Sequence, residues 1–91
     1  MTLTETHTVD RDADLRDRVR ELMATTFLIE AAELSDDVSQ QTCARWTSLY
    51  HMMLLVVLEE QFGVSLSVDE MTAMTSLPKI VGVLKGYGAS A

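Results

Sequence analysis

Ser48 and His51 are the residues whose types and spacing suggest chemistry in this chain. They stand three positions apart, so on a helix they would be neighbours, and a histidine can act as general base for a serine. No acid is placed in the sequence to orient that histidine. Glu59 and Glu60 are adjacent and would point in different directions on a helix, so they make no catalytic carboxylate pair. We therefore expect no catalytic residues and no enzyme.

Metal and thiol chemistry have little support either. His7 and His51 are the two histidines, and their separation gives no metal-ligand spacing. Cys43 is the single cysteine, has no activating neighbour beyond Arg45, and is interpreted as an inert thiol. Glycine-rich phosphate loops are absent from the sequence. We expect no metal site.

The position of Ser48 suits the attachment of a phosphate ester. Residues 46–63 read as one helix that begins at Thr47 or Ser48, with Thr47 able to cap it and Gly63 able to end it. A phosphate on Ser48 would lie beside backbone N–H groups at the positive end of the helix dipole. The plainer alternative is that Ser48 is only a capping or first-turn residue.

Three further helices and one long connection must position this serine. Apolar residues at helical spacing predict a first helix over about 12–27 and a last helix over 77–85. Ser67 and Glu70 form a capping-box pattern that predicts a short helix between the central and last ones. Residues 28–46 read as a long packed loop with a short helical turn. Four apolar residues are expected to anchor this loop: Leu28, Ile29, Leu34 and Val38.

The length and composition predict one small all-α domain. Ninety-one residues suggest a flexible N-terminal tail at 1–10, a folded domain at 11–88 and a flexible end at 89–91. The apolar run at 52–58 is much shorter than the ~20 residues that cross a bilayer. The N-terminus has no secretory pattern. We therefore expect no membrane association and a cytoplasmic location, where a lone cysteine stays reduced.

The charge distribution points to protein partners. The formal net charge is −7, and from Glu21 to Pro78 there are nine carboxylates and one basic residue, Arg45. Such an acidic stretch argues against nucleic acid, because nucleic-acid binding depends on lysine and arginine. It favours partners with basic surfaces, although an acidic surface that only keeps the protein soluble is the alternative.

The ordered set of motifs around Ser48 resembles the acyl carrier protein family. It comprises Trp46-Thr-Ser-Leu-Tyr-His51 and Leu58-Glu-Glu-Gln-Phe-Gly63, with fourteen residues from Ser48 to Phe62. Leu34-Ser-Asp-Asp-Val-Ser39 upstream and Met74-Thr-Ser-Leu77 downstream also look like that family. The resemblance covers roughly residues 15–84. The form Trp-x-Ser-Leu-x-His looks most like free-standing carriers of polyketide or nonribosomal peptide pathways.

This resemblance implies a small four-helix acyl-carrier-like bundle of three principal helices and one short one. A phosphopantetheinyl transferase would use Mg²⁺ to attach 4′-phosphopantetheine from coenzyme A to Ser48. The thiol of the arm would then carry an acyl or aminoacyl group as a thioester. The implied partners are acyl-loading and acyl-transferring enzymes of the ligase, ketosynthase, acyltransferase or condensation type. The chain would act as a monomer and catalyse nothing itself.

Partner binding is expected mainly on the helix that carries Ser48. The implied partner-binding residues are Thr47, Leu49, Tyr50, Met53, Val56, Glu59 and Glu60. On a helix, Met52, Met53 and Val56 share a broad arc with the two glutamates, away from the leucines of the run. The alternative is that Met52, Met53 and Val56 belong to the core, since methionine commonly fills gaps there.

Two positions depart from the family's usual pattern. Thr47 stands where an aspartate usually precedes the modified serine, and Tyr50 stands where an acid is common. Thr47 can still cap the helix, but it lacks the charge that helps to position the serine for the transferase and its Mg²⁺. Two other readings therefore stay open: a degenerate carrier-like adaptor that binds its partner without an arm, and an unrelated acidic helical interaction module.

Overall fold

A computed structural model describes residues 11–89, which form four α-helices and one 3₁₀-helix. The elements in chain order are α2 (Arg11–Phe27), η1 (Ala31–Glu33), α3 (Ser48–Phe62), α4 (Val68–Ala73) and α5 (Leu77–Gly86). The all-α fold with three principal helices and one short helix is confirmed. The tail expected at 1–10 and the last two residues, 90 and 91, lie outside the described residues. The domain limits therefore stay a prediction.

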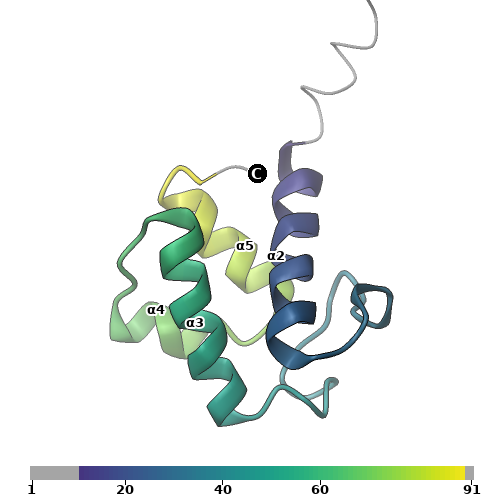
Figure 1. Cartoon of the computed structure of the whole chain (residues 1–91). Coiled ribbons are helices and arrows are strands. Elements are labelled where there is room, and N and C mark those ends of the chain that lie inside the picture. The colour runs from purple at the N-terminus through teal and green to yellow at the C-terminus, as the bar shows by residue number, and fades with distance from the viewer. Residues whose placement is uncertain (1–10, 90–91) are drawn as a thin grey trace, which may run out of the picture.

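Helix α2 packs against both α3 and α5, while α4 lies beside α3 at its other flank (Figure 1). Arg18 in the middle of α2 bonds Gln61 near the end of α3. At the other end of the pair, Phe27 of α2 contacts Tyr50 of α3, with 6.2 Å between the ring centroids. The start of α3 therefore lies beside the end of α2.

One apolar core joins the principal helices and the long connection. Its buried residues are Leu15, Val19, Met23, Ala24, Phe27, Leu34, Val38, Trp46, Leu54, Leu55, Leu58, Leu66, Met74, Leu77, Ile80 and Leu84. The α2 members recur mostly every four residues, which is the spacing of one helix face. Within the described residues no polar or charged residue is buried. Burial of these side chains is the main stabilising term of the fold.

The helix ends follow the local sequence signals. The hydroxyl of Thr47 accepts the N–H of Tyr50 at the start of α3. Gly63 has φ +64°, and its N–H and that of Val64 both donate to the carbonyl of Glu59, which closes the last turn. Because glycine adopts this left-handed backbone without a Cβ clash, it ends α3 at little cost. The predicted caps of the central helix are confirmed.

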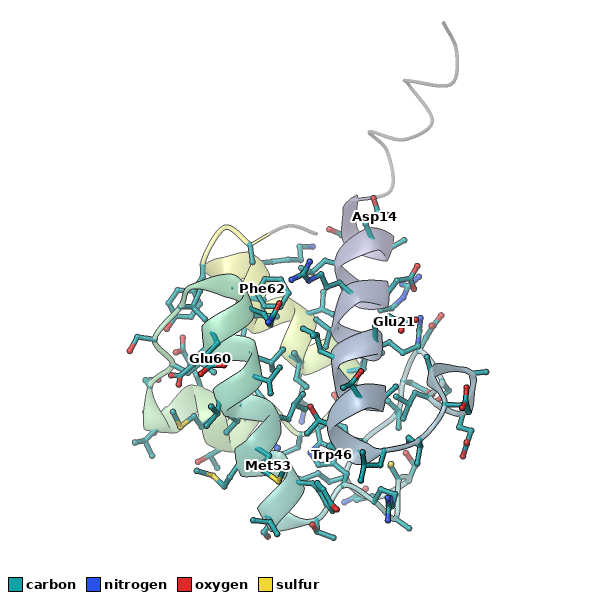
Figure 2. All side chains as sticks on the ribbon, viewed as in Figure 1. Asp14, Glu21, Trp46, Met53, Glu60 and Phe62 are labelled. Atoms are coloured by element: carbon teal, nitrogen blue, oxygen red, sulfur yellow. The ribbon has the colours of Figure 1, made fainter. Side chains whose placement is uncertain are left out.

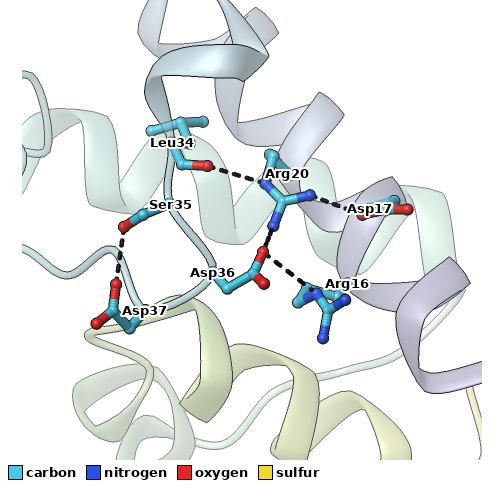
Figure 3. A network of polar contacts seen from close by, with 7 residues as sticks. All are labelled: Arg16, Asp17, Arg20, Leu34, Ser35, Asp36 and Asp37. Carbon is cyan, nitrogen blue, oxygen red and sulfur yellow. Dashed lines mark hydrogen bonds and ion pairs between the residues drawn. The ribbon is translucent and has the colours of Figure 1, made fainter.

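The long connection is held to the bundle at several points. Arg20 of α2 donates from Nε to the carbonyl of Leu34 at 3.0 Å, and its other nitrogens pair with Asp17 and Asp36 (Figure 3). Further along, the carbonyl of Val38 accepts the N–H of Leu77 at 2.8 Å. These bonds fix a stretch that contains only the short helix η1. They thereby set the path of the chain toward Ser48.

Three of the four expected anchors of the connection are confirmed. Leu34 and Val38 are buried, and Ile29 is half-buried against the core. Leu28 is different: its side chain is 70% exposed and its backbone has φ +62°. The expectation for Leu28 was wrong because this residue ends α2, and the left-handed backbone that turns the chain points its side chain away from the core.

Candidate functional site

Ser48 is the first residue of α3, and its side chain is exposed. Thr47, and not Ser48, supplies the side-chain oxygen that caps the helix, at 3.3 Å from the nitrogen of Tyr50. Of the two roles in the plainer alternative, Ser48 is therefore a first-turn residue and not the cap. An exposed hydroxyl in the first turn lies where the helix dipole favours a negative group such as a phosphate.

A hydrogen bond between Trp46 and His51 joins the backbone before Ser48 to the backbone after it. Trp46 is 3% exposed, and its indole N–H donates to Nδ1 of His51 at 2.9 Å. Because indole can only donate, Nδ1 must be an acceptor, so the ring proton is on Nε2. Nε2 then donates to the carbonyl of Met71 in α4 at 3.0 Å. Both histidine nitrogens are therefore engaged, and His51 serves as a structural link rather than as a base for Ser48.

A second set of contacts fixes the entry to α3 against the end of α2. Arg45 donates from Nε to the carbonyl of Phe27 at 2.9 Å, and its guanidinium lies 5.7 Å from the ring centroid of Tyr50. The ring centroid of Phe27 lies 5.5 Å from that of Trp46. Trp46 lies low in the bundle, between the two helices (Figure 2). These contacts hold the residues next to Ser48 while the serine itself faces solvent.

A cavity of about 310 Å³ adjoins Ser48 between α3 and α4. It is lined by Gln40, Ser48, His51, Met52, Leu55, Met71, Thr72 and Thr75. The lining combines amide and hydroxyl groups with methionine and leucine side chains. Such a lining suits a slender group that carries both amides and methylenes, tethered at the serine.

The implied partner-binding residues divide into exposed and half-buried sets. Leu49, Met53 and Val56 are 67%, 44% and 52% exposed, and Thr47 and Glu60 are also exposed. Met52 is 54% exposed as well. The alternative that the two methionines and Val56 belong to the core is therefore wrong. Met53 and Glu60 lie two turns apart on α3 (Figure 2).

The half-buried members of the set have structural contacts of their own. Tyr50 packs against Phe27, as described above. Glu59 accepts the N–H of Leu66 on Oε2 at 2.9 Å. This bond fixes the segment between α3 and α4. Of the two adjacent glutamates, Glu60 is thus the one that faces solvent. Their assignment to partner binding stays a prediction.

The stretch of chain around Ser48 carries little charge. No carboxylate occurs from Ser39 to Leu58, and Arg45 is the one charged residue in that interval. Among residues 11–89 no group of three histidine, cysteine or acidic side chains is placed to hold a metal ion. In the same part of the chain, no helix combines the length and the apolar character that a membrane crossing needs.

A polar network with shifted pKa values lies away from Ser48, where α4 meets the end of α5. The hydroxyl of Tyr87 donates to Glu70 at 2.5 Å and lies 3.0 Å from the carbonyl of Ser65. The backbone N–H of Ser67, followed by the hydrogen bond from Tyr87, lowers the pKa of Glu70. The bond to Glu70 raises the pKa of Tyr87. The hydrogen bonds that cause these shifts hold the start of α4 and take no part in the serine site.

Comparison with known proteins adds evidence on identity. No protein-family model matches the chain. The polyketide-8 synthase acyl carrier protein 2 of Streptomyces avermitilis is 34% identical to it over 62 residues, which is 68% of this chain and 71% of the relative. The chain belongs to the acyl carrier protein family. For this acyl carrier protein, both the resemblance read from the motifs and the four-helix bundle it implied are confirmed.

One exposed residue of the acyl carrier protein was missed as a candidate site residue. Leu28 lies beside Tyr50, Met53 and Val56, with which it lines a second cavity. The available signal was its place directly after the predicted end of the first helix, where glycine or asparagine is the usual residue.

Proposed function

We propose that this acyl carrier protein bears 4′-phosphopantetheine on Ser48 and serves a polyketide pathway, as the name of its Streptomyces relative suggests. When bound, the arm supplies a thiol that holds an acyl or aminoacyl group as a thioester. The observation that carries the proposal is the exposed hydroxyl of Ser48 at the positive end of α3, held in place by neighbours that are themselves engaged. The protein carries and presents its cargo rather than catalysing a reaction.

The residues around Ser48 fit the proposed group. The phosphodiester would lie at the start of α3, where unpaired backbone N–H groups and the dipole favour an anion. Gln40, Thr72 and Thr75 offer polar partners for the amides of an arm, and Met52 and Leu55 offer apolar surface for its methylenes. The cavity that these residues line opens at the serine, so an arm tethered there can reach it.

Ser48 would receive the arm in one transfer. Its hydroxyl would attack the pantetheine-side phosphorus of coenzyme A, release adenosine 3′,5′-bisphosphate, and lose its proton to the transferase. Thr47 keeps the first turn of α3 formed, and the Trp46–His51 bond keeps the preceding loop in place. These residues fix the backbone that carries the nucleophilic oxygen, which is the contribution that the carrier makes to the transfer.

Mass spectrometry of the apo protein tests this function. Incubation with coenzyme A, Mg²⁺ and a broad-specificity phosphopantetheinyl transferase is expected to add one phosphopantetheine, and Ser48→Ala is expected to add none. Ser65→Ala is the matched control, because Ser65 is also exposed and uses its backbone carbonyl, not its hydroxyl, in the contact with Tyr87. Failure of several transferases to load the wild-type protein would contradict the proposal.

A second candidate function is a carrier-like adaptor that binds its partners without an arm. It is favoured by Thr47, which replaces the aspartate usual in the family, and by the lack of carboxylates from Ser39 to Leu58. Intact-mass analysis of protein from its native producer separates the two. A mass that includes the arm supports the carrier, while unmodified protein that is active in its pathway supports the adaptor.

A further inference from the structure

A polar cavity of about 280 Å³ lies where the long connection meets the start of α5. This lysine cavity is lined by Ser39, Gln40, Gln41, Thr75, Ser76 and Lys79. Two of these residues, Gln40 and Thr75, also line the cavity that adjoins Ser48. The two cavities are therefore neighbours. A group that is tethered at Ser48 and lies along the first cavity is led toward the lysine cavity.

Backbone pairing between two distant segments fixes the walls of the lysine cavity. The N–H of Gln40 donates to the carbonyl of Thr75 at 3.0 Å. The neighbouring residues Ser39 and Ser76 form an antiparallel β-bridge. Because the backbone is paired across the cavity, the positions from which the lining side chains project are fixed. The cavity is thus built by the fold, from the long connection on one side and the start of α5 on the other.

The lysine cavity contains hydrogen-bond donors that the fold does not use. Within residues 11–89, the side chains of Gln40, Thr75 and Lys79 have no hydrogen-bond or ion-pair partner. The other basic side chains from Arg16 to Lys85 all have a bonded partner. An amide, a hydroxyl and an ammonium group can each donate to an acceptor. The cavity therefore offers three kinds of free donor and one unpaired positive charge.

These donors select an anionic ligand. No acidic residue lines either cavity, so Lys79 supplies the formal charge there. A carboxylate accepts hydrogen bonds on both of its oxygens, and its bond to an ammonium group is charge-assisted. A methyl group in the same place would satisfy none of the donors. The lysine cavity thus fits the end of a ligand that carries a carboxylate better than the end of an alkyl chain.

We infer that the lysine cavity is a subsite for a carboxylate at the far end of the acyl cargo, with Lys79 as its counter-ion. The inference rests on the proposed function and adds the chemical class of the cargo, an acyl group derived from a dicarboxylic acid. Gln40 and Thr75 border both cavities, so they lie beside the passage from the arm to the cargo. Because Lys79 is exposed, the attraction is weak and depends on salt.

Two acylated carriers that differ only at the end of the cargo test the subsite. A broad-specificity phosphopantetheinyl transferase attaches the succinyl or the butyryl form of the arm from the matching coenzyme A thioester, and intact mass verifies each product. Both cargoes have the same number of carbons, but succinyl ends in a carboxylate and butyryl in a methyl group. In ¹H–¹⁵N spectra, the succinyl carrier is expected to show shifted backbone amides at Gln40, Gln41 and Lys79 relative to the butyryl carrier. High salt is expected to abolish this difference.

Two variants on α5 locate the effect. Lys79→Met keeps an extended side chain without the charge, so the difference between the succinyl and butyryl carriers is expected to be lost. Its melting temperature should stay close to that of the wild type, because the side chain is exposed and has no partner within residues 11–89. Lys85→Met is the matched control. It removes a charge that pairs with Asp12 outside the cavity, and it is expected to keep the difference.

Several outcomes would overturn the inference. If the succinyl and butyryl carriers have the same amide positions around the cavity, the carboxylate is not held there, while the proposed function stands because both carriers were loaded. If the difference survives Lys79→Met, this lysine is not the counter-ion. If the amides shift when the bare arm is attached and shift no further with succinyl, the cavity holds the arm and not the cargo. If the wild type takes up no arm at all, the proposed function fails, and this inference fails with it.

Discussion

At the scale of single residues, the serine site has one reactive group, the hydroxyl of Ser48. The side chains next to it are engaged in structural contacts. Trp46 and His51 bond each other, and Arg45 bonds the end of α2, so none of the three is available for chemistry at Ser48. Spacing alone predicted that Ser48 and His51 would be near each other. It could not predict that His51 points to Trp46 and Met71, because Met71 reaches it only through the packing of α4.

Thr47 permits a direct test of how charge before the serine affects loading. We predict that Thr47→Asp keeps the cap, because a carboxylate can also accept the N–H of Tyr50, and that it loads faster with a broad-specificity transferase. The added charge at the helix start should also stabilise the fold by about 0.5 kcal/mol. Initial loading rates by intact mass and urea unfolding measure the two effects.

Thr47→Asn is the control for this experiment, since it has the size of aspartate and caps equally well without charge. It is expected to load like the wild type. Equal rates for Thr47→Asp and the wild type would mean that the missing carboxylate does not limit modification.

At the scale of elements, helix limits followed the local signals closely. Ser67 and Glu70 form the predicted capping box, and the hydroxyl of Ser76 accepts the N–H of Lys79 at the start of α5. These motifs act within four residues, so the sequence contains everything that they need. The contact of Tyr87 with Glu70 was not predicted, because it joins residues that are seventeen positions apart.

The capping box makes part of the stability depend on pH. The pKa of Glu70 is lowered from its ordinary value of 4.5, chiefly by the backbone N–H of Ser67. Its contribution is therefore present above pH 4.5 and is lost as the pH falls through the lowered pKa. We predict that Glu70→Gln is less stable than the wild type at pH 7 and that the difference shrinks below pH 4.5. Melting temperatures across this range measure it.

Tyr87→Phe is the companion variant for the pH experiment. It removes the second cause of the lowered pKa, so the loss of stability on acidification should be smaller than in the wild type and should be complete at a higher pH. A constant difference between Glu70→Gln and the wild type at every pH would show that the carboxylate charge contributes nothing to the cap.

At the scale of the whole molecule, the long connection depends on contacts with elements distant in sequence. Arg20 of α2 holds the carbonyl of Leu34 and pairs with Asp36 (Figure 3). Val38 bonds the start of α5 through its carbonyl. After this connection, Trp46 is buried in the core and Ser48 is exposed at the surface. The serine is thus positioned by the packing of three helices rather than by its own helix alone.

We predict that Arg20→Met loosens the connection. The side chain of Arg20 is 15% exposed, and a charge-assisted bond to a backbone carbonyl in such a place contributes about 1–2 kcal/mol. Urea unfolding should show that loss, and hydrogen exchange should quicken at the backbone amides of residues 34–43.

Arg18→Met is the matched control on the same helix. Arg18 is exposed and contacts the side chains of Gln61 and Phe62, so its loss should cost less than about 0.5 kcal/mol and leave exchange in the connection unchanged. Equal behaviour of the two variants would mean that the Arg20 network does not hold the connection.

The sequence by itself determined the helices, their caps, the family and the serine that is the candidate for modification. Helical spacing, caps and motifs are local properties, so they can be read without coordinates. Only the tertiary structure decided which surfaces stay open. It placed Met53 and Val56 outside the core, engaged His51 with Met71, and turned Leu28 outward beside α3. These outcomes depend on how α2, α3 and α4 pack together, and side-chain exposure is settled by that packing rather than by any residue's own preference.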